Sequence, residues 1–440
     1  LSQFLGSCAL LMRRWSAAFL TPRRCLSSLS GSYRVCIVGS GPSGFYTAKY
    51  LLKENEDLHI DIIDRLPTPY GLVRSGVAPD HQNTKSVMSD FSNTLDNPKV
   101  RFHGNVEVGT DISVSELRTH YDALVLAYGA EGDRALGIPG EDLIGVRSAR
   151  ELVNWYNGHP DYVSVGFEDL LQTTSETVVI GQGNVAIDVS RVLLTSLDIL
   201  RNSDICDHAL TALEKSTIQK VSVIGRRGPI QASFTIKELR ELTSLVGTHC
   251  SISKEEIEKG KNHASLQEAK ARPTKRKFDL MEKIANKPNS NAGGRELIIR
   301  FFLEPLEIVG DSNGRAKEVI CAITSLSGEP GLQRACDTGE RISLPAQLVL
   351  TSVGYKSKGM EGIPFDDKRN VIPSLHGRVI KGVGSLDIVP GVYVSGWLKR
   401  GPSGIIGTNI PDAKETAKSI REDLSEIKDH SQRSELRFET

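Results

Sequence analysis

The sequence predicts an α/β fold with two Rossmann-like units, because two separate segments follow the order strand, glycine-rich turn, helix and strand. The 440 residues are 39% hydrophobic and 25% charged, which is ordinary globular composition and excludes collagen-like, disordered and disulfide-scaffold chains. At roughly 150 residues per domain, this length predicts two or three domains. No apolar run reaches the ~18 residues needed to span a bilayer.

Charge and cysteine usage exclude further classes. The 54 basic residues equal the 54 acidic ones, and this zero balance argues against a general nucleic-acid binder. The seven cysteines are scattered and form no C-x-x-C pair, so they fit neither a zinc site nor a dithiol redox centre. We therefore expect free thiols in a reducing compartment, no metal and no nucleic-acid partner.

The first 32 residues differ in composition from the rest of the chain. They hold arginines and many serines but no acidic residue, and the first acidic residue of the chain is Glu54. Such a leader is typical of an organellar transit peptide, and residues 1–32 are interpreted as one. Two alternatives stay open. Residues 4–12 resemble a secretory apolar region with unsuitable flanks, and a first residue of Leu rather than Met is compatible with untranslated or wrongly assigned sequence.

The first Rossmann-like unit begins at residue 34. Residues 34–39 (RVCIVG) have the composition of a buried parallel strand, and the turn 39–44 (GSGPSG) follows. A helical stretch and a second strand ending at Asp64 come next. A G-x-G-x-x-G motif alone is weak evidence, but this full context with an acid about 20 residues on is a strong dinucleotide fingerprint.

Each residue of this turn has a physical reason. Gly39 permits the tight turn, Gly41 lets the backbone approach a pyrophosphate, and Gly44 lets helix and strand pack closely. The helix N-terminus offers unpaired N–H groups and a positive dipole end to phosphates. Asp64 is expected to accept hydrogen bonds from ribose hydroxyls.

The second unit has a strand at 177–180, the turn 181–186 (GQGNVA), a helix, and a strand ending at Gly225. Arg226 and Arg227 then stand where an NAD-binding protein would have an acid. Arginine at this place selects the 2′-phosphate of NADP through charge-assisted hydrogen bonds. The second site is therefore assigned to NADP(H), and the first to a different dinucleotide, FAD. Because nicotinamide gives up electrons as a hydride and flavin can release them singly, the pair indicates a converter from two-electron to one-electron transfer.

The remaining segments fit this scheme. Segments 123–130 and 348–354 are strands that end in glycine and suit crossings between domains, and 392–408 is a strand with a glycine-rich turn that returns to the first domain. The helix after that turn would aim its positive N-terminal dipole at the flavin. We expect an inserted helix at 198–216, helices with a surface loop at 251–297, and an amphipathic helix with a solvated tail at 412–440.

Taken together, these motifs resemble the mitochondrial NADPH:adrenodoxin (ferredoxin) oxidoreductase family. The resemblance covers roughly residues 33–425 and rests on long, specific stretches: VGSGPSGFYTA (38–48), YGLVRSGVAPDH (70–81), GNVEVG (104–109), AYGAEGDRALGIPGE (127–141), GQGNVAID (181–188), IGRRGPIQASFTIKELRE (224–241), GYKS (354–357) and SGWLKRGPSGIIGT (395–408). It implies a glutathione-reductase-like flavoprotein with an FAD-binding domain at 33–131 and 361–440. An NADP-binding domain at 132–360 is inserted between them.

The resemblance also implies site residues, matched by position in this sequence. The FAD contacts are Gly39, Gly41, Ser43, Gly44, Asp64, Leu72, Val108, Trp397, Gly404, Ile405 and Ile406. The NADP contacts are Gln182, Gly183, Asn184, Val185, Arg226, Arg227, Glu238 and Gly404. His81 and Asp188 match positions near the flavin and nicotinamide and are the candidate catalytic residues, although hydride transfer itself needs no general acid.

The implied partner is a small acidic [2Fe–2S] ferredoxin of mitochondria. Family docking positions match Arg240, Arg272 and Arg276, and residues 270–277 (KARPTKRK) carry five positive charges without an acid. A basic face would steer an acidic partner and make the rate depend on salt. The implied location is the mitochondrial matrix, with the matrix face of the inner membrane as a variant of it, and the chain is expected to be a monomer with at most peripheral membrane association.

Other functions stay open from the sequence. Disulfide reduction would need a C-x-x-C pair, and an electron-input subunit of another flavoenzyme would usually bring cysteine clusters; both are missing from the sequence. An inactive nucleotide-binding homologue is suggested by Gly407, where alanine is usual in the family, and by an end at Thr440 that comes earlier than is usual.

Overall fold

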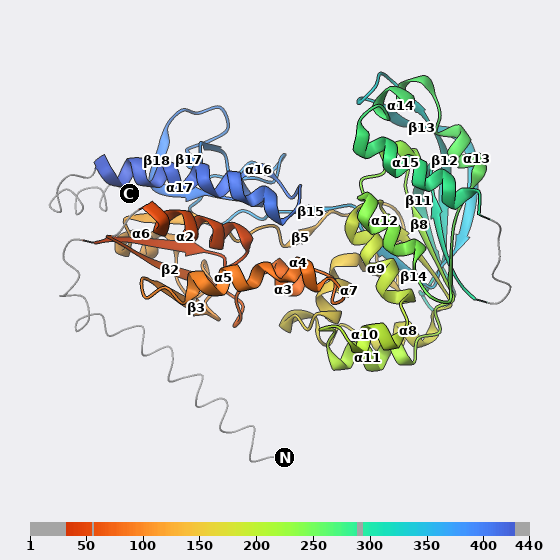
Figure 1. Cartoon of the computed structure of the whole chain (residues 1–440), viewed down its shortest axis with the longest axis horizontal. Helices are drawn as coiled ribbons and strands as arrows, with labels where there is room; N and C mark the ends of the chain where they lie inside the picture. Colours follow the sequence, from red (N-terminus) through yellow and green to blue (C-terminus); the bar gives the residue numbers. More distant parts are fainter. Residues whose placement is uncertain (1–31, 55–56, 288–293, 427–440) are drawn as a thin grey trace, which may run out of the picture.

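The structure, a computed structural model, describes residues 32–54, 57–287 and 294–426. Figure 1 shows two lobes side by side along the longest axis, with the short strands β5 (Gly132–Asp133) and β15 (Tyr355–Lys356) between them. The first lobe contains both the red and orange N-terminal part and the blue C-terminal part. The predicted leader, apart from Ser32, and the predicted tail beyond Glu426 lie outside the described residues.

The first lobe is built on a seven-stranded sheet. The four strands β4, β1, β2 and β3 are neighbours and run parallel, β18 joins β4 in parallel, and β17 and β16 extend the edge in antiparallel pairs. In sheet order the strands are β16 (Ser374–Leu375), β17 (Arg378–Ile380), β18 (Ile388–Val394), β4 (Ala123–Leu126), β1 (Tyr33–Val38), β2 (Leu58–Asp64) and β3 (Val100–Gly104).

Helices from both ends of the described chain cover this sheet. α2 begins directly after the first glycine turn, and α17 packs along it although they are far apart in sequence. The helical segments of this lobe are α2 (Pro42–Glu54), α3 (Leu72–Ser75), α4 (Gln82–Lys85), α5 (Val87–Leu95), α6 (Val114–His120), α16 (Trp397–Arg400), η3 (Ile406–Thr408) and α17 (Asn409–Glu426). Alanines and Ile420 of α17 close the core over Phe45 and Leu51, which explains why the C-terminal segment returns to this lobe.

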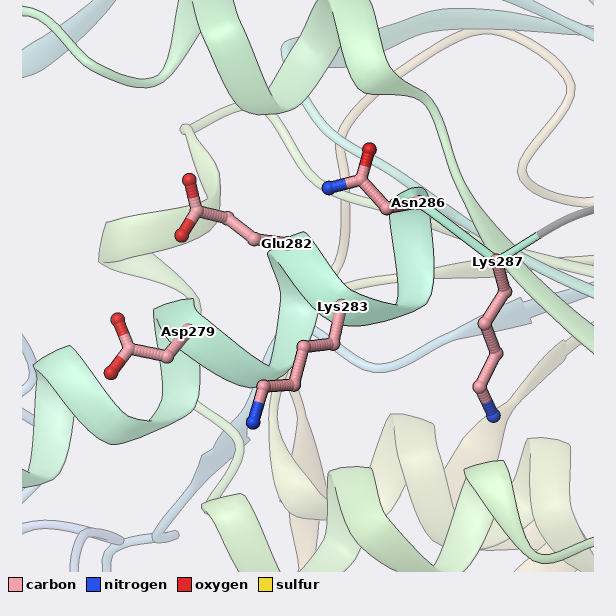
Figure 2. A pocket seen from close by; sticks show the side chains of 5 residues that line it. All are labelled: Asp279, Glu282, Lys283, Asn286 and Lys287. Carbon is pink, nitrogen blue, oxygen red and sulfur yellow. The ribbon is translucent and has the colours of Figure 1, made fainter.

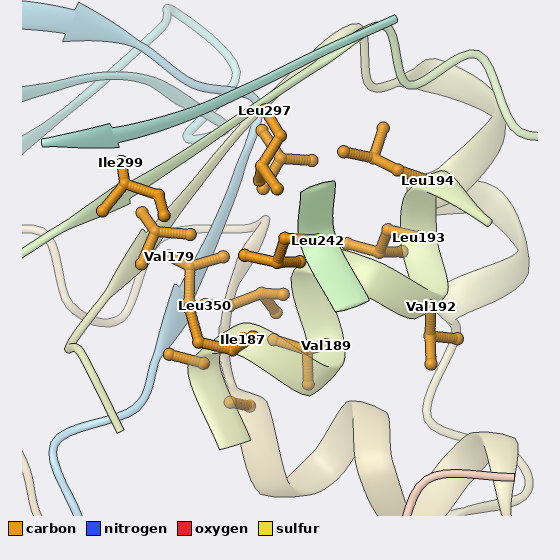
Figure 3. Packing of buried hydrophobic residues seen from close by; sticks show 14 of the residues in the cluster. Val179, Ile187, Val189, Val192, Leu193, Leu194, Leu242, Leu297, Ile299 and Leu350 are labelled. Carbon is orange, nitrogen blue, oxygen red and sulfur yellow. The ribbon is translucent and has the colours of Figure 1, made fainter. Parts of the chain in front are cut away.

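The second lobe is built on a six-stranded, fully parallel sheet. Parallel sheets are covered on both faces, and the strand interiors here are accordingly apolar. In sheet order the strands are β6 (Val146–Ser148), β14 (Leu348–Thr351), β7 (Glu176–Ile180), β8 (Lys220–Ile224), β10 (Arg295–Arg300) and β9 (Thr248–Ile252). Figure 3 shows Val179, Ile299 and Leu350 of this sheet packed against Ile187 and Leu242 from the covering helices.

The helices of the second lobe are mostly short. They are α7 (Ala149–Tyr156), η1 (Pro160–Tyr162), α8 (Phe167–Thr173), α9 (Asn184–Leu194), α10 (Leu197–Arg201), α11 (Asp207–Glu214), η2 (Pro229–Gln231), α12 (Ile236–Thr243), α13 (Lys254–Lys259), α14 (His263–Glu268) and α15 (Arg272–Ala285). The single inserted helix predicted at 198–216 is in fact two, α10 and α11. The helical conformation is interrupted between them. Cys206 is extended there, and its backbone N–H donates a hydrogen bond to Tyr156 O at 3.1 Å.

A second sheet in this lobe was not predicted. β11 (Leu303–Gly310), β12 (Ala316–Ser327) and β13 (Arg334–Pro345) form an antiparallel meander. Its inner residues, including Val319 and Cys321, complete a separate apolar cluster with Ile224 of the parallel sheet. Most residues of β13 are exposed and many are polar or charged, so no apolar run in the sequence marks this strand.

The two connections between the lobes pair with each other. β5 and β15 are antiparallel, with Tyr355 opposite Asp133, and Arg150 of α7 holds Asp133 through two hydrogen bonds of 2.9 and 3.0 Å. These crossings lie beside the predicted boundaries at 131/132 and 360/361, which stay predictions. In the described part of the chain, no helix is both long and apolar enough to cross a membrane.

Candidate functional site

The first glycine turn lies at the carboxyl end of β1, where the strand order reverses between β1 and β4. Open α/β sheets bind ligands at such a switch point. Gly39 has φ +107°, and a Cβ there would stand 2.6 Å from Ala127 O, so only glycine fits. A Cβ at Gly44 would stand 2.1 Å from Gly39 O, whereas a Cβ at Gly41 would meet nothing within 4 Å. The turn is therefore tight against the protein on one side and open at Gly41.

Residues predicted around the first turn lie next to it. Asp64 ends β2, and one carboxylate oxygen accepts bonds from the Ser40 N–H at 2.7 Å and the Ser40 hydroxyl at 2.6 Å. Leu72 begins α3 directly after Gly71, where a Cβ would stand 3.0 Å from the Gly41 Cα. Val108 is buried near the end of the same sheet. The other carboxylate oxygen accepts the Leu66 N–H at 2.9 Å, so Asp64 ties the turn to the end of β2, and the residue as a whole is half-buried.

The return segment approaches the same place. The buried Ser43 hydroxyl donates to the Ser395 hydroxyl at 2.8 Å, which joins α2 to the end of β18. Trp397 follows and bonds through its indole N–H to Ser403 O at 3.2 Å, and its ring lies 5.8 Å from that of Tyr355. Gly404 and Ile405 come next, directly before η3, which begins at Ile406 and leads into α17. Ile405 is 65% exposed, which is unusual for this side chain and consistent with a surface that a ligand covers.

The second glycine turn repeats the first in the other lobe. It follows β7 at the switch point between β7 and β14. Gly181 has φ +128°, and a Cβ there would stand 2.2 Å from Ser352 O, just as Gly39 presses on the residue after β4. A Cβ at Gly183 would meet nothing within 4 Å, and α9 begins at the next residue with no side-chain cap. The open turn and the uncapped N–H groups of an 11-residue helix suit a pyrophosphate.

The loop after β8 packs on this second turn. The carbonyl oxygen of Gln182 accepts the N–H groups of Ser233 and Phe234, both at 3.0 Å, and Asn184 Oδ1 accepts the Thr235 N–H at 2.9 Å. Val185 is half-buried in the first turn of α9. The structure thus brings the predicted residues 182–185 against the loop that begins with the two predicted arginines.

Arg226 and Arg227 are both exposed at the carboxyl end of β8. Arg226 forms a loose ion pair with Glu304 at 3.4 Å. Within the described residues, Arg227 forms no salt bridge, so its guanidinium is available to an anion. Two exposed arginines beside an open dinucleotide turn match the donor set that a phosphomonoester needs.

The two candidate catalytic residues meet at the junction of the lobes. His81 caps α4 in the first lobe, and its Nδ1 lies 3.8 Å from Asp188 Oδ1 on α9 of the second. The His81 Nε2 lies 2.7 Å from Glu241 Oε2 and 3.9 Å from Glu238 Oε2. The ligand atoms of His81, Glu238 and Glu241 lie within 4.8 Å of one another, as in a metal site, although the short His81–Glu241 bond already uses one of the ring nitrogens.

One arginine holds this junction together. The Arg191 side chain, 4% exposed, bonds to Asp188 at 2.8 Å on its own helix and to Asp80 across the junction, and lies 3.6 Å from Glu241. Burial and the nearby charges of Glu238 and Glu241 raise the pKa of Asp188 well above its usual range. The raised pKa favours the protonated form of Asp188 at this junction.

Sequence reasoning missed part of this cluster. It named His81, Asp188 and Glu238 but not Asp80, Arg191 or Glu241. Asp188 and Arg191 have the i, i+3 spacing that places both on one helix face, and this signal was available. The contact with Asp80 and His81 joins residues more than 100 positions apart, and no local pattern predicts it.

The predicted docking residues lie in the second lobe. Arg240 is exposed on α12, and Arg272 and Arg276 are exposed on α15, which packs against α12. A shallow hollow further along α15 is lined by Asp279, Glu282, Lys283, Asn286 and Lys287 (Figure 2). No predicted site residue lines it, and its mixed charges do not match either dinucleotide turn.

Comparison with known proteins defines the class first. Residues 33–255 match the family model described as pyridine nucleotide-disulphide oxidoreductase. The chain is therefore an oxidoreductase of this class, which confirms the predicted fold class.

Individual relatives define the family. The chain is 47% identical over 425 residues to NADPH:adrenodoxin oxidoreductase, mitochondrial, of Arabidopsis thaliana, covering 94% of this chain and 87% of the relative. It is 42% identical to the protein of the same name from Bos taurus, covering 93% and 84%. A solved structure of Mycobacterium tuberculosis FprA in complex with NADPH matches with a TM-score of 0.83 and 42% identity, covering 91% of this chain and 86% of that one. The chain belongs to the NADPH:adrenodoxin oxidoreductase family, as the motifs predicted.

The glycine turns yield a paired prediction. Gly41→Ala is expected to leave the melting temperature of the cofactor-free protein unchanged, because its Cβ would meet no protein atom, but to weaken FAD binding at least tenfold by blocking close backbone approach. Gly44→Ala is expected to destabilise the cofactor-free protein by about 1–3 kcal/mol or more, because its Cβ would press on a backbone oxygen.

Thermal unfolding without FAD and fluorescence titration with FAD separate the two effects. A cofactor-free Gly41→Ala protein that melts as early as Gly44→Ala, or one that binds FAD as the unaltered protein does, would contradict the assignment of the open turn to the cofactor.

Proposed function

We propose that this chain takes a hydride from NADPH onto bound FAD and passes electrons singly to an iron–sulfur ferredoxin. One observation carries the proposal: two open glycine turns lie in one chain, and only the second is followed by a pair of exposed arginines. FAD and NADP(H) are the cofactors. FAD supplies the change from paired to single electrons, and the protein binds, orients and shields both cofactors.

The first lobe is proposed to hold FAD. The open Gly41 turn and the start of α2 suit its pyrophosphate, and Asp64 suits a ribose because each carboxylate oxygen has lone-pair capacity beyond its bonds to Ser40 and Leu66. Leu72 and Val108 lie beside the same turn and strand end. Trp397 and residues 404–406, with α17 starting just behind, suit the ring end of the cofactor, where a helix N-terminus favours negative charge.

The second lobe is proposed to hold NADP(H). Residues 182–185 would bind the pyrophosphate, and Arg226 and Arg227 the 2′-phosphate. Glu238 is buried at the junction, and its Oε2 has no hydrogen-bond partner among the described residues. A free buried acceptor suits an N–H donor such as the amide of a nicotinamide, which would place the reactive ring between the lobes. Gly404 would contact this ring from the first lobe.

His81 and Asp188 are proposed to act at that ring as proton-holding and orienting residues. Hydride transfer moves no separate proton, but the electrons leave for the ferredoxin one at a time and the proton balance of the site must follow. Burial and the neighbouring acids Glu238 and Glu241 raise the pKa of Asp188, which favours its protonated form relative to an exposed carboxyl. The 2.7 Å bond to Glu241 fixes the His81 ring in place.

The partner is proposed to be a small acidic [2Fe–2S] ferredoxin of the mitochondrial matrix. Arg240, Arg272 and Arg276 form no salt bridge within the described residues and stand on two packed helices. The basic leader of residues 1–32 and relatives named as mitochondrial support the matrix as location. A monomer with at most peripheral contact to the inner membrane completes the proposal.

Hydride transfer is tested directly by stopped-flow absorbance. Mixing the FAD-loaded protein with NADPH under anaerobic conditions is expected to bleach the visible flavin band, and NADH is expected to do so far more slowly. A flavin band that stays unchanged, in a protein shown by titration to bind NADPH, would refute the proposed reaction.

Coenzyme choice is tested at the arginine pair. Replacing Arg226 and Arg227 together by Ala is expected to cost ~2–4 kcal/mol of NADPH binding and to change NADH binding little, because hydrogen bonds to charged groups contribute about 1.5–3 kcal/mol each and do not add fully. The matched control replaces Lys283 and Lys287, two exposed cations of the same lobe, by Ala. Equal losses for both coenzymes would show that the pair does not recognise the phosphate.

Partner docking is tested by charge reversal. Changing Arg240, Arg272 and Arg276 together to Glu is expected to raise the KM for a [2Fe–2S] ferredoxin more than tenfold at low salt, while NADPH-driven reduction of ferricyanide stays unchanged. The loss should shrink as ionic strength rises. Arg101→Glu, an exposed cation of the first lobe, serves as the control. A comparable loss in that variant would place docking elsewhere.

A further inference from the structure

Lys277 is a buried cation in the middle of α15. Its neighbours Arg276 and Lys275 are exposed, but Lys277 is only 9% exposed and belongs to the inward face of the helix with Phe278 and Met281. Lysine is rarely buried unless it is paired with an acid. Lys277 is one of the five positive charges of the predicted docking run 270–277, but its burial keeps it from forming part of an exposed basic face.

No salt-bridge partner of Lys277 is found among the residues that the structure describes. Its ammonium donates a hydrogen bond to Ala232 O and lies 5.5 Å from the centre of the Phe234 ring. Within the described residues it forms no salt bridge. A carbonyl dipole and an aromatic face stabilise an ammonium only in part, so the positive charge is left unbalanced in a dry place.

The loop that Lys277 holds is the one that packs on the second glycine turn. Ala232 is followed by Ser233 and Phe234, whose N–H groups donate to Gln182 O at 3.0 Å. The same loop starts with Arg226 and Arg227. Lys277 is therefore bonded to the same loop that begins with the proposed 2′-phosphate site.

Electrostatics links Lys277 to that site. Burial and, secondly, the positive charge of Arg227 lower the pKa of Lys277 to about 8. The acids on the surrounding helices have partners other than Lys277. Glu238 and Glu241 of α12 face His81, and Glu256 of α13 binds Arg300. Glu268 of α14 binds Gln231 and Gln333 and interacts electrostatically with Arg227, and Lys259 of α13 lies over Phe302.

We propose that Lys277 is a specificity-determining residue for NADP(H) that acts through the loop of Arg226 and Arg227 without touching the nucleotide. A dianionic 2′-phosphate bound at the arginine pair supplies the negative charge that the buried ammonium lacks, so Lys277 favours the phosphorylated coenzyme. This inference rests on the proposed function, because it needs the 2′-phosphate at Arg226 and Arg227.

The inference has a pH signature. A bound phosphate stabilises the protonated ammonium, so the pKa of Lys277 is higher in the complex than in the free protein, and binding takes up protons near pH 8. Affinity for the phosphorylated ligand is then complete below the free pKa and declines as pH rises through it. A rise of one unit on binding makes the affinity about sevenfold weaker at pH 9.5 than at pH 7. The phosphate itself stays dianionic over this range.

Calorimetry with two small probes tests this in the FAD-loaded full chain. The probes are 2′,5′-ADP, which carries the 2′-phosphate, and 5′-AMP, which lacks it. Titrations run at pH 7, 8 and 9.5, and at pH 8 in two buffers of different ionisation enthalpy to count the protons taken up. The variants are Lys277→Met, Lys277→Arg, the exposed control Lys275→Met and the double variant with Arg226 and Arg227 changed to Ala.

Several results together support the role of Lys277. The unaltered protein and Lys275→Met take up a fraction of a proton with 2′,5′-ADP and none with 5′-AMP. Lys277→Met binds 2′,5′-ADP about tenfold more weakly at pH 7, takes up no proton and keeps its affinity for 5′-AMP within twofold. Lys277→Arg keeps the charge and loses the pH dependence. Proton uptake by the unaltered protein needs no variant, so the test survives a variant that fails to fold.

Two failures remain distinguishable. If the double arginine variant binds 2′,5′-ADP as tightly as the unaltered protein, the proposed 2′-phosphate site is wrong. If that variant loses affinity but binding in the unaltered protein takes up no proton between pH 7 and 9.5, or Lys277→Met behaves as Lys275→Met does, the role of Lys277 is overturned and the site stands.

Discussion

The structure depends on one buried guanidinium. Arg191 lies on the helix that follows the second glycine turn, yet it bonds to Asp80 from the first lobe as well as to Asp188 on its own helix. A buried charge is tolerated only with its partners in place, so this contact fixes the segment containing His81 against α9 and α12. A second buried cation makes a similar contact between the lobes: Lys85 of α4, 2% exposed, forms an ion pair of 2.8 Å with Asp204 in the second lobe. Hydride transfer needs reacting atoms about 3–3.5 Å apart, and a fixed junction between the two dinucleotide turns is what makes such a distance reproducible.

The glycine turns of the two lobes have the same backbone geometry, but the side chains beside them differ in charge. Gly39 and Gly181 each press against the backbone that follows a neighbouring strand, and Gly41 and Gly183 each face open space. What distinguishes the two sites is the side chain at the end of the next strand of the sheet. Asp64 is an acceptor in the first lobe, and a pair of arginines takes the equivalent place in the second. In the proposed scheme, backbone geometry suits both turns to a pyrophosphate, and the side chain at this position suits the first site to ribose hydroxyls and the second to a 2′-phosphate.

Local patterns predicted what local physics controls. The glycine turns, their strands and helices, and the arginine pair follow from spacing, because each residue type satisfies a requirement of its own backbone. The β11–β13 meander was not predicted because β13 is largely exposed and polar. The split between α10 and α11 was not predicted because it depends on a tertiary contact with Tyr156. The junction between the lobes was not predicted either, because only the tertiary fold brings Asp80 and Arg191 together. The burial of Lys277 was not predicted either, because it lies in a run of basic residues that the sequence suggests are all exposed.

That run, residues 270–277, looks like a single basic patch in the sequence, but the structure divides it by burial. Arg272 and Arg276 face solvent, where their attraction for an acidic partner acts over a distance and is screened by salt. Lys277, one residue further, faces the interior beside the loop of Arg227, where screening is weak and the charge acts on its immediate surroundings. In the proposed scheme, α15 therefore carries two kinds of positive charge. The exposed arginines would attract an acidic protein, and the buried lysine would favour one of two coenzymes that differ by a phosphate. Both kinds fit on α15 because neighbouring residues of an amphipathic helix point in different directions, so that one can be exposed and the next buried.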